Sequence, residues 1–288
     1  MSARTATLTG LTAILMWSLL AVMTVAAGAI PPFQLMAMTF AVGAAAGFVA
    51  RPSALRALGQ PWRAVLVGVG GLFGYHALYF LALRLAPPAE AGLICYLWPL
   101  LIVLFSSLLP GERLKAHHII GALLGLAGTV LLLSGKVDLA LSSSQFAGYA
   151  VALAAAFVWA GYSVLSRRFR EVPTDAVAGY CAMTAVLAVV VHRFIEATVW
   201  PQGQLAWLAI AGLGIGPVGA AFFTWDIGMK RGDIRVLGAA SYATPLLSTG
   251  FLIAAGYAQP SAGIAIAAAL IAGGGLIAAK DMMGKKSA

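Results

Sequence analysis

Ten stretches of 17 to 24 residues with almost no charge follow one another along this chain. A helix needs about 20 apolar residues to cross the hydrocarbon core of a bilayer. The stretches lack the strict alternation of apolar and polar residues that marks a barrel strand, so each is predicted to be an α-helix. The expected spans are residues 7–28, 32–50, 64–83, 90–109, 118–134, 146–165, 176–195, 206–229, 234–255 and 262–279.

The composition argues against a water-soluble fold. Only 9% of the 288 residues are charged and 61% are hydrophobic, whereas a soluble domain carries about a quarter charged residues. We therefore expect an all-α polytopic membrane protein that is surrounded by the lipid bilayer. The two cysteines, Cys95 and Cys181, fall inside expected spans and are interpreted as buried thiols rather than as a disulfide.

The distribution of Lys and Arg orients these spans. With the N-terminus inside, 15 of the 18 Lys and Arg lie on the inner side, and only Arg84, Lys136 and Arg193 lie outside. Positive charge accumulates in cytoplasmic loops, so we expect a bacterial inner-membrane protein with both termini in the cytoplasm. The net charge of +9 is scattered over short loops, which favours contact with anionic lipid and argues against a nucleic-acid partner.

A short motif occurs twice in the chain. Residues 96–101 read YLWPLL and residues 242–247 read YATPLL, an offset of 146 residues, and pairs near the start of each half have an offset of 142. A difference of four residues is what an insertion in a connecting loop would produce. Two domains of five helices are therefore expected, in residues 1–135 and 146–280. The repeat pairs are Tyr96 and Tyr242, Pro99 and Pro245, Tyr79 and Trp225, Arg84 and Lys230, Trp17 and Trp159, and Pro31 and Pro173.

An odd number of helices per repeat has a topological consequence. The second copy must enter the membrane from the opposite face, so the two copies form an inverted-topology repeat. In secondary transporters such repeats place a substrate site near the membrane midplane, and one copy rocks against the other to expose it to each side in turn. The expected fold is thus ten transmembrane helices in two inverted five-helix repeats.

The chain resembles the drug/metabolite transporter superfamily, in its ten-helix EamA branch, over nearly its whole length. The motifs are LMWSLL, FVWAGYSVLSRR, the segment YHALYFLALRLAPPAEAGLICYLWPLLIVLFSSLLPGERL and the glycine-rich IIGALLGLAGTVLLL. The second half departs from the pattern, because YAQPS stands where the first half has PGERL with its acidic residue. The resemblance implies transport, often export, of small metabolites.

Within the branch, YHALYFLAL followed by CYLWPLL is most similar to the bacterial aromatic amino acid exporters. This resemblance implies secondary transport of Phe, Tyr and Trp as the small-molecule substrates. Exporters of other amino acids, or of small amphipathic or cationic metabolites, are the alternative.

Residues 64–83 carry the most informative group of polar aromatic side chains. On an ideal helix Tyr75, Tyr79 and His76 lie at about 0°, 40° and 100° around the axis, so they share one flank. Lipid-facing tyrosine normally lies at the membrane interface, and an ionisable residue at mid-span is a candidate site residue. We interpret this flank as the wall of a substrate-binding cavity. The alternative is a set of side chains satisfied by hydrogen bonds to neighbouring helices.

Other aromatic residues are candidates for the same cavity. Trp17 and Trp159 occupy equivalent mid-span positions of the repeat, with packing between the copies as the alternative. Tyr96 and Trp98 lie about 160° apart on an ideal helix and can face one cavity only if the helix is distorted. The further candidates are Tyr162 and Tyr242. Aromatic walls suit an aromatic amino acid through stacking and through attraction of its ammonium to the ring faces.

Pro99 and Pro245 are predicted to distort their helices. Proline removes a backbone hydrogen bond and clashes with the carbonyl four residues earlier, which for Pro99 is that of Cys95. Irregular backbone at membrane depth is tolerated mainly beside protein or a water-filled cavity. We predict that both prolines are hinge or gating positions, with a static kink as the alternative. Trp98 corresponds to Thr244 in the other copy, so the site need not be symmetric.

Other classes of protein find less support in the sequence. No GxxxxGK[ST] loop occurs, so an ATP-driven pump is not expected. HExxH and GxSxG are also absent, and we expect neither an enzyme with catalytic residues nor a metal or cofactor. His117 and His118 point about 100° apart, make a poor metal pair and are interpreted as a solvated helix start. A channel or a scaffold protein remains an alternative, which solute counterflow in liposomes would distinguish from a carrier.

Two further expectations concern packing. Asp226 is the deepest acidic residue, and Lys230, four residues later, can pair with it on a helix. Gly121, Gly125 and Gly128 give residues 118–134 a small-residue face, which is expected to pack inside the bundle rather than against a second molecule. The protein is accordingly expected to be a monomer or a weak homodimer.

Overall fold

The computed structural model describes residues 1–111, 113–134, 145–256 and 259–281, and every regular element within them is helical. Glu112, Lys136 and the connection between the two expected domains, except residue 145, lie outside the described residues. The α-helices are α1 (Ala3–Trp17), α2 (Leu20–Ala27), α3 (Pro32–Ala50), α4 (Trp62–Val69), α5 (Tyr75–Leu85), α6 (Pro88–Cys95), α7 (Trp98–Ser106), α8 (Ala116–Ser134), α9 (Phe146–Leu165), α10 (Ala176–Ile195), α11 (Gly203–Ile215), α12 (Ala221–Arg231), α13 (Ile234–Ala240), α14 (Ala243–Ala254) and α15 (Ala262–Ala278).

Seven helical runs within the described residues are long and apolar enough to cross a membrane, and three shorter apolar helices accompany them. Each expected span overlaps one of these runs, so the all-α polytopic membrane fold is confirmed. The number of helices that cross the bilayer stays a prediction. The long runs are Ala3–Ala27, Pro32–Ala50, Trp62–Leu85, Phe146–Phe169, Ala176–Ile195, Gly203–Arg231 and Ile234–Ala254, and the shorter ones are Glu90–Ser106, Ala116–Leu132 and Ala262–Ala278.

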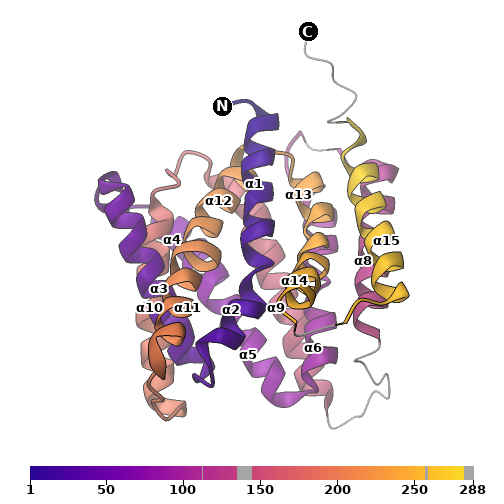
Figure 1. The fold of residues 1–288 in the computed structure, drawn as a ribbon. Coiled ribbons are helices and arrows are strands. Elements are labelled where there is room, and N and C mark those ends of the chain that lie inside the picture. The colour runs from indigo at the N-terminus through magenta and orange to yellow at the C-terminus, as the bar shows by residue number, and fades with distance from the viewer. Residues whose placement is uncertain (112, 135–144, 257–258, 282–288) are drawn as a thin grey trace.

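Helices from the two halves of the chain pack against one another within a single bundle (Figure 1). The most extensive contacts are those of α8 with α15, α3 with α10, α1 with α12 and α5 with α9. Each of these pairs joins a helix before residue 135 to a helix after residue 144. The interface between the halves therefore runs through the middle of the molecule, where a substrate site of a repeat transporter is expected.

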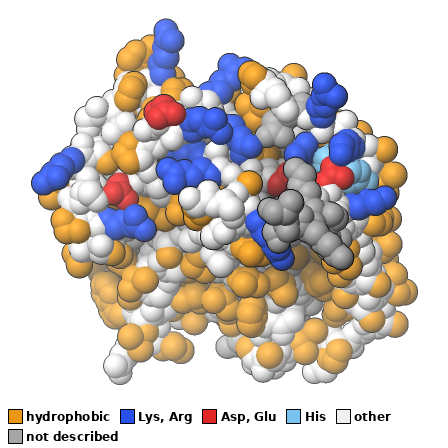
Figure 2. All heavy atoms as spheres, turned by 90° about the horizontal axis from the view of Figure 1, so that it is seen from above, with side chains coloured by type: hydrophobic (Ala, Val, Ile, Leu, Met, Phe, Trp, Pro, Cys, Tyr) orange, Lys and Arg blue, Asp and Glu red, His pale blue; other side chains and the backbone are white. Residues whose placement is uncertain are grey.

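One end of the bundle carries many basic side chains, and we call it the basic end. The N-terminus and the C-terminal end of α15 lie at the same end (Figure 1), and Lys and Arg side chains are spread over that face (Figure 2). Large apolar side chains on the helix sides are exposed, for example Leu66 at 62%, Val186 at 63% and Leu208 at 60%. Such a surface is stable when hydrocarbon rather than water covers it.

Glycines bring α8 and α15 into close contact. A Cβ atom added at Gly121 would lie 2.5 Å from the carbonyl oxygen of Gly274, and one at Gly128 would lie 2.9 Å from that of Ala267. Gly125 faces the ring of Tyr242 in the same way, with the nearest ring atom at 2.6 Å. The expectation that this glycine face packs inside the bundle is confirmed.

Candidate substrate cavity

Two helices are interrupted at corresponding places in the two halves. α6 ends at Cys95 and α7 begins at Trp98, and α13 ends at Ala240 and α14 begins at Ala243. Each following proline lies in the first turn of the new helix, where a backbone N–H would have no partner inside that helix. The predicted distortions beside Pro99 and Pro245 are therefore present, and their role as hinges stays a prediction.

Two π-helical turns also recur at corresponding places, at Gly70–Gly74 and Gly216–Ala220. Such turns are frequent beside functional sites. The first lets the ring of Tyr162 pack directly on Gly71, where an added Cβ atom would lie 2.3 Å from the ring. In the second, the Pro217 carbonyl oxygen accepts a hydrogen bond from Trp17 Nε1 at 3.0 Å. The turns lead into α5 and α12, which contribute walls to a central cavity.

The cavity has a volume of about 560 Å³, a size typical of small-molecule sites. Ile30 and Pro32 line it at the connection between α2 and α3, which lies at the end of the bundle away from the N-terminus (Figure 1). The cavity thus reaches from the middle of the bundle towards that end. The predicted site residues on its wall are Trp17, Tyr75, His76, Tyr79, Tyr96, Trp98 and Trp159.

The flank of α5 forms one wall, as its helical spacing predicts. The rings of Tyr75 and Tyr79 are nearly parallel, with centroids 6.1 Å apart. His76 Nδ1 lies 2.6 Å from the Leu72 carbonyl oxygen. Because a carbonyl can only accept, Nδ1 carries the proton, and in neutral histidine Nε2 is then an acceptor. The Tyr75 hydroxyl accepts a hydrogen bond from the Cys95 thiol.

Three indole rings, from Trp17, Trp98 and Trp159, form the floor of the cavity. Trp225 packs behind them, and we call the four rings the tryptophan cluster. The Trp17 centroid lies 5.0 Å from that of Trp225 and 5.6 Å from that of Trp159. The Trp98 centroid lies 6.2 Å from that of Trp159. These separations are within the range of favourable aromatic contact. Trp225 is fully buried, and its Nε1 donates to Ser163 Oγ at 3.1 Å.

Two predicted site residues lie outside the cavity wall. Tyr162 packs behind Trp159, with ring centroids 5.3 Å apart, and its buried hydroxyl makes no hydrogen bond to a residue that the structure describes. Tyr242 is fully buried, and its hydroxyl accepts a hydrogen bond from the backbone N–H of Leu100 at 3.2 Å. In this arrangement both support residues on the wall rather than face the cavity.

Several wall residues were not predicted from the sequence. The phenylalanines among them could not be predicted, because an apolar residue in an apolar span has the same pattern whether it faces a cavity or lipid. Thr244 was noted only as the counterpart of Trp98. These wall residues include Thr39, Phe40, Phe80, Phe222, Thr244 and Ser248.

The described wall of the cavity carries no Lys, Arg, Asp or Glu, and a buried ion pair lies further along α12. Asp226 and Lys230 follow Trp225 along α12, and Lys230 Nζ lies 3.0 Å from Asp226 Oδ2, which confirms the expected pair. Thr174 Oγ1 donates to the same carboxylate at 2.7 Å, and Lys230 Nζ donates to the Val172 carbonyl oxygen at 2.9 Å. Both charged side chains are almost completely buried, so the pair lies inside the bundle, on the part of α12 between Trp225 and Arg231.

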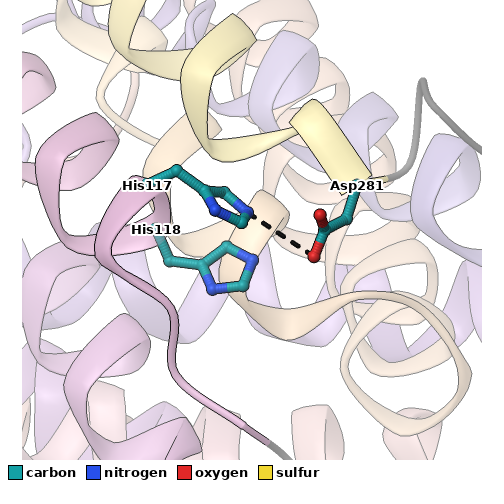
Figure 3. Close-up of side chains that lie close together, drawn as sticks. All are labelled: His117, His118 and Asp281. Carbon is teal, nitrogen blue, oxygen red and sulfur yellow. Dashed lines mark ion pairs between the residues drawn. The ribbon is translucent and has the colours of Figure 1, made fainter.

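The histidine pair is far better packed than the sequence suggested. His117 and His118 lie at the start of α8, beside Asp281, which follows α15 (Figure 3). One ring nitrogen of each histidine and one carboxylate oxygen of Asp281 lie within 4.8 Å of one another. His118 is fully buried, so the expected solvated helix start is wrong for this residue. The backbone N–H of Lys115 donates to His118 Nδ1. Lys115 Nζ donates to Asp281 Oδ2 at 2.6 Å, and this hydrogen bond lowers the pKa of the Asp281 carboxyl.

A bundle of apolar helices around a central cavity with aromatic walls is the architecture of a membrane transporter. The chain belongs to the EamA-like transporter family, whose model matches residues 4–134 and 146–280. It is similar to the aromatic amino acid exporter YddG of Ancylobacter novellus, with 57% identity over 282 residues, 96% of this chain and 98% of that one. The protein is accordingly a transporter and not an enzyme.

Two further comparisons agree with this assignment. The aromatic amino acid exporter YddG of Salmonella typhimurium is 27% identical over 169 residues, 56% of each chain. A solved crystal structure of a protein with 54% sequence identity has a TM-score of 0.93 and covers 99% of this chain and 100% of its own.

Proposed function

We propose that the protein exports aromatic amino acids from the cytoplasm as a secondary transporter that works by alternating access. The observation that carries the proposal is the cavity, because aromatic rings make up much of its wall and no charged side chain lies on its described part. Such walls bury the ring of an aromatic amino acid and attract its ammonium group. The relative with 57% identity is itself named an aromatic amino acid exporter.

The two repeats, residues 1–135 and 146–280, are the units that move against one another in this proposal. In this proposal the tryptophan cluster and the buried Asp226–Lys230 pair close the basic end, and the cavity, which extends towards the opposite end, opens there. With the basic end in the cytoplasm, this arrangement is the outward-facing state. Export then requires the cluster to separate while the opposite end closes, with Pro99 and Pro245 as the positions where α6–α7 and α13–α14 bend.

The orientation gives a first prediction. Because Lys and Arg gather at the end that carries the N-terminus, both termini are expected in the cytoplasm of a bacterium, with the protein in its inner membrane. Reporter fusions that are active only in the cytoplasm should therefore be active at either terminus. If a reporter that works only in the periplasm is active when it is fused to the C-terminus, the number of spans cannot be even.

The aromatic wall gives a second prediction. Tyr79→Ala and His76→Ala should each lower the initial rate of amino acid counterflow about tenfold, because each removes a ring that contacts the substrate. The measurement is exchange of labelled phenylalanine in proteoliposomes, together with the thermal unfolding midpoint in detergent. The midpoint should change little, since neither side chain belongs to the buried core.

Leu81→Ala provides the matched control for these variants. Leu81 lies on the same helix, is 43% exposed and does not line the cavity. Its variant should exchange phenylalanine at the wild-type rate. Wild-type kinetics in both Tyr79→Ala and His76→Ala would exclude this cavity as the substrate site.

A further inference from the structure

The cavity holds no formal charge with which to bind a zwitterion. Its described wall contains hydroxyls, one imidazole and aromatic rings, but no Lys, Arg, Asp or Glu. Ring faces attract an ammonium group but repel a carboxylate. If the proposed function is correct, the substrate carboxylate must therefore be held by neutral donors, and the wall should contain a place where such donors converge.

The break between α13 and α14 creates such a place. α14 is a helix of 12 residues that begins at Ala243, beside the cavity, and no side-chain hydrogen bond caps its N-terminus. The N-terminus of a helix carries partial positive charge and favours anions. In transporters with interrupted helices, N-termini at membrane depth are directed towards anionic groups of the substrate.

Thr244, in the first turn of α14, supplies the second observation. Its side chain lines the cavity and is only 7% exposed. Its Oγ1 is buried and makes no hydrogen bond to any residue that the structure describes. Ser248, one turn further along the helix, lines the same wall. By contrast, Thr249 lies off the wall and satisfies its hydroxyl by donating to the Pro245 carbonyl oxygen at 2.9 Å.

The start of α7, which corresponds in the first half of the chain to the start of α14, is occupied by other side chains. Trp98 occupies the place of Thr244 there, and the backbone N–H of Leu100 in α7 already donates to the Tyr242 hydroxyl. The counterpart of that bond, from Leu246 to Tyr96, is absent among the described residues, and Tyr96 lines the cavity instead. At the start of α14 the Thr244 N–H donates to the Ser241 carbonyl oxygen at 3.0 Å, but no side chain caps the helix, whereas the Tyr242 hydroxyl accepts from the first turn of α7.

We propose that Thr244 and the N-terminus of α14 form the carboxylate subsite of this transporter, with the Ser248 hydroxyl beside it. The subsite would orient an aromatic amino acid with its carboxylate towards α14 and its ring among the tryptophans and α5 tyrosines. It would also distinguish amino acids from aromatic amines, which lack the carboxylate. Thr244 is therefore a specificity-determining residue.

The test compares phenylalanine with phenethylamine, which has the same ring and amine but no carboxylate. In proteoliposomes, Thr244→Val should raise the KM for phenylalanine about tenfold or more, because it removes a hydrogen bond to a charged group. The concentration of phenethylamine that half-inhibits exchange should change less than about twofold, since it has no carboxylate for this hydroxyl to bind. Thr244→Ser, which keeps the hydroxyl, should retain the wild-type KM.

The unfolding temperature of the Thr244 variants distinguishes a role of Thr244 in substrate binding from a role in holding the fold together. Because Thr244 Oγ1 has no hydrogen-bond partner among the described residues, Thr244→Val should unfold at or above the wild-type temperature. Thr249→Val is the matched control on the same helix and should leave the KM unchanged. Thr244→Ala gives the same comparison if the valine variant packs poorly.

An unchanged KM for phenylalanine in Thr244→Val and Thr244→Ala would overturn the subsite. An equal loss of affinity for phenylalanine and phenethylamine would overturn it as well, because phenethylamine has no carboxylate that the subsite could bind. A wild-type protein that exchanges no aromatic amino acid would contradict the proposed function, and the subsite with it. Intact wild-type exchange with unaffected Thr244 variants contradicts the subsite alone.

Discussion

Lys230→Met is expected to lower the free energy of unfolding by about 3–5 kcal/mol, the usual cost of leaving one buried charge without its partner. Lys230 Nζ lies 3.0 Å from Asp226 Oδ2, and both side chains are at most 5% exposed. The methionine has a similar length but no charge, so the Asp226 carboxylate would stay buried, with Thr174 as its one remaining donor among the described residues. Thermal unfolding of purified protein in detergent measures the loss.

Two variants make this result specific to the pair. Arg231→Met removes the neighbouring positive charge, but Arg231 is exposed, so stability should change by less than about 0.5 kcal/mol. Asp226→Asn combined with Lys230→Met removes both charges and keeps an acceptor for Thr174, so most of the lost stability should return. A double variant as unstable as Lys230→Met would show that the charge pair is not the cause.

Trp225→Ala is expected to have the second large effect, a loss of about 3–5 kcal/mol of stability together with a leak of substrate through the cavity floor. Trp225 is fully buried, touches the other rings of the tryptophan cluster and is held by Ser163. Its removal leaves a void between the cavity and the Asp226–Lys230 pair. Release of trapped labelled alanine, which the wild-type carrier should not transport, measures the leak separately from carrier-mediated efflux of phenylalanine.

Trp207→Ala is the matched control for this variant. Trp207 lies on α11 and is 47% exposed, so its loss should affect neither stability nor leak appreciably. Trp225→Phe should retain part of both properties, because a smaller ring still fills much of the space. A stable and tight Trp225→Ala variant would contradict the assignment of the tryptophan cluster as the closed floor.

The sequence predicted the helical segments well because run length and charge are strong signals in a membrane protein. The same holds for the wall on α5, where helical periodicity alone placed Tyr75, His76 and Tyr79 on one flank, and they do line the cavity together. The break before Pro99 was also predictable, since proline excludes one helix hydrogen bond. It lets Tyr96 and Trp98 face the same cavity despite their angular separation.

The repeat in the sequence could not predict which member of an equivalent residue pair lines the cavity. The repeat makes Tyr96 and Tyr242 equivalent, yet Tyr96 lines the cavity and Tyr242 is hydrogen-bonded to Leu100. Alternating access requires the two copies to differ in any one state, and a sequence cannot say which copy takes which conformation. The phenylalanines of the wall were missed for a different reason, because burial against a substrate and burial against lipid select the same side chains.

Counterflow of labelled phenylalanine into proteoliposomes tests the central claim most directly. Liposomes loaded with unlabelled phenylalanine, tryptophan or tyrosine should accumulate the label transiently, without ATP and without an imposed pH gradient. Liposomes loaded with alanine should not, because its side chain cannot fill the aromatic cavity. Absence of accumulation with every aromatic amino acid, or equal accumulation with alanine, would contradict an aromatic amino acid transporter.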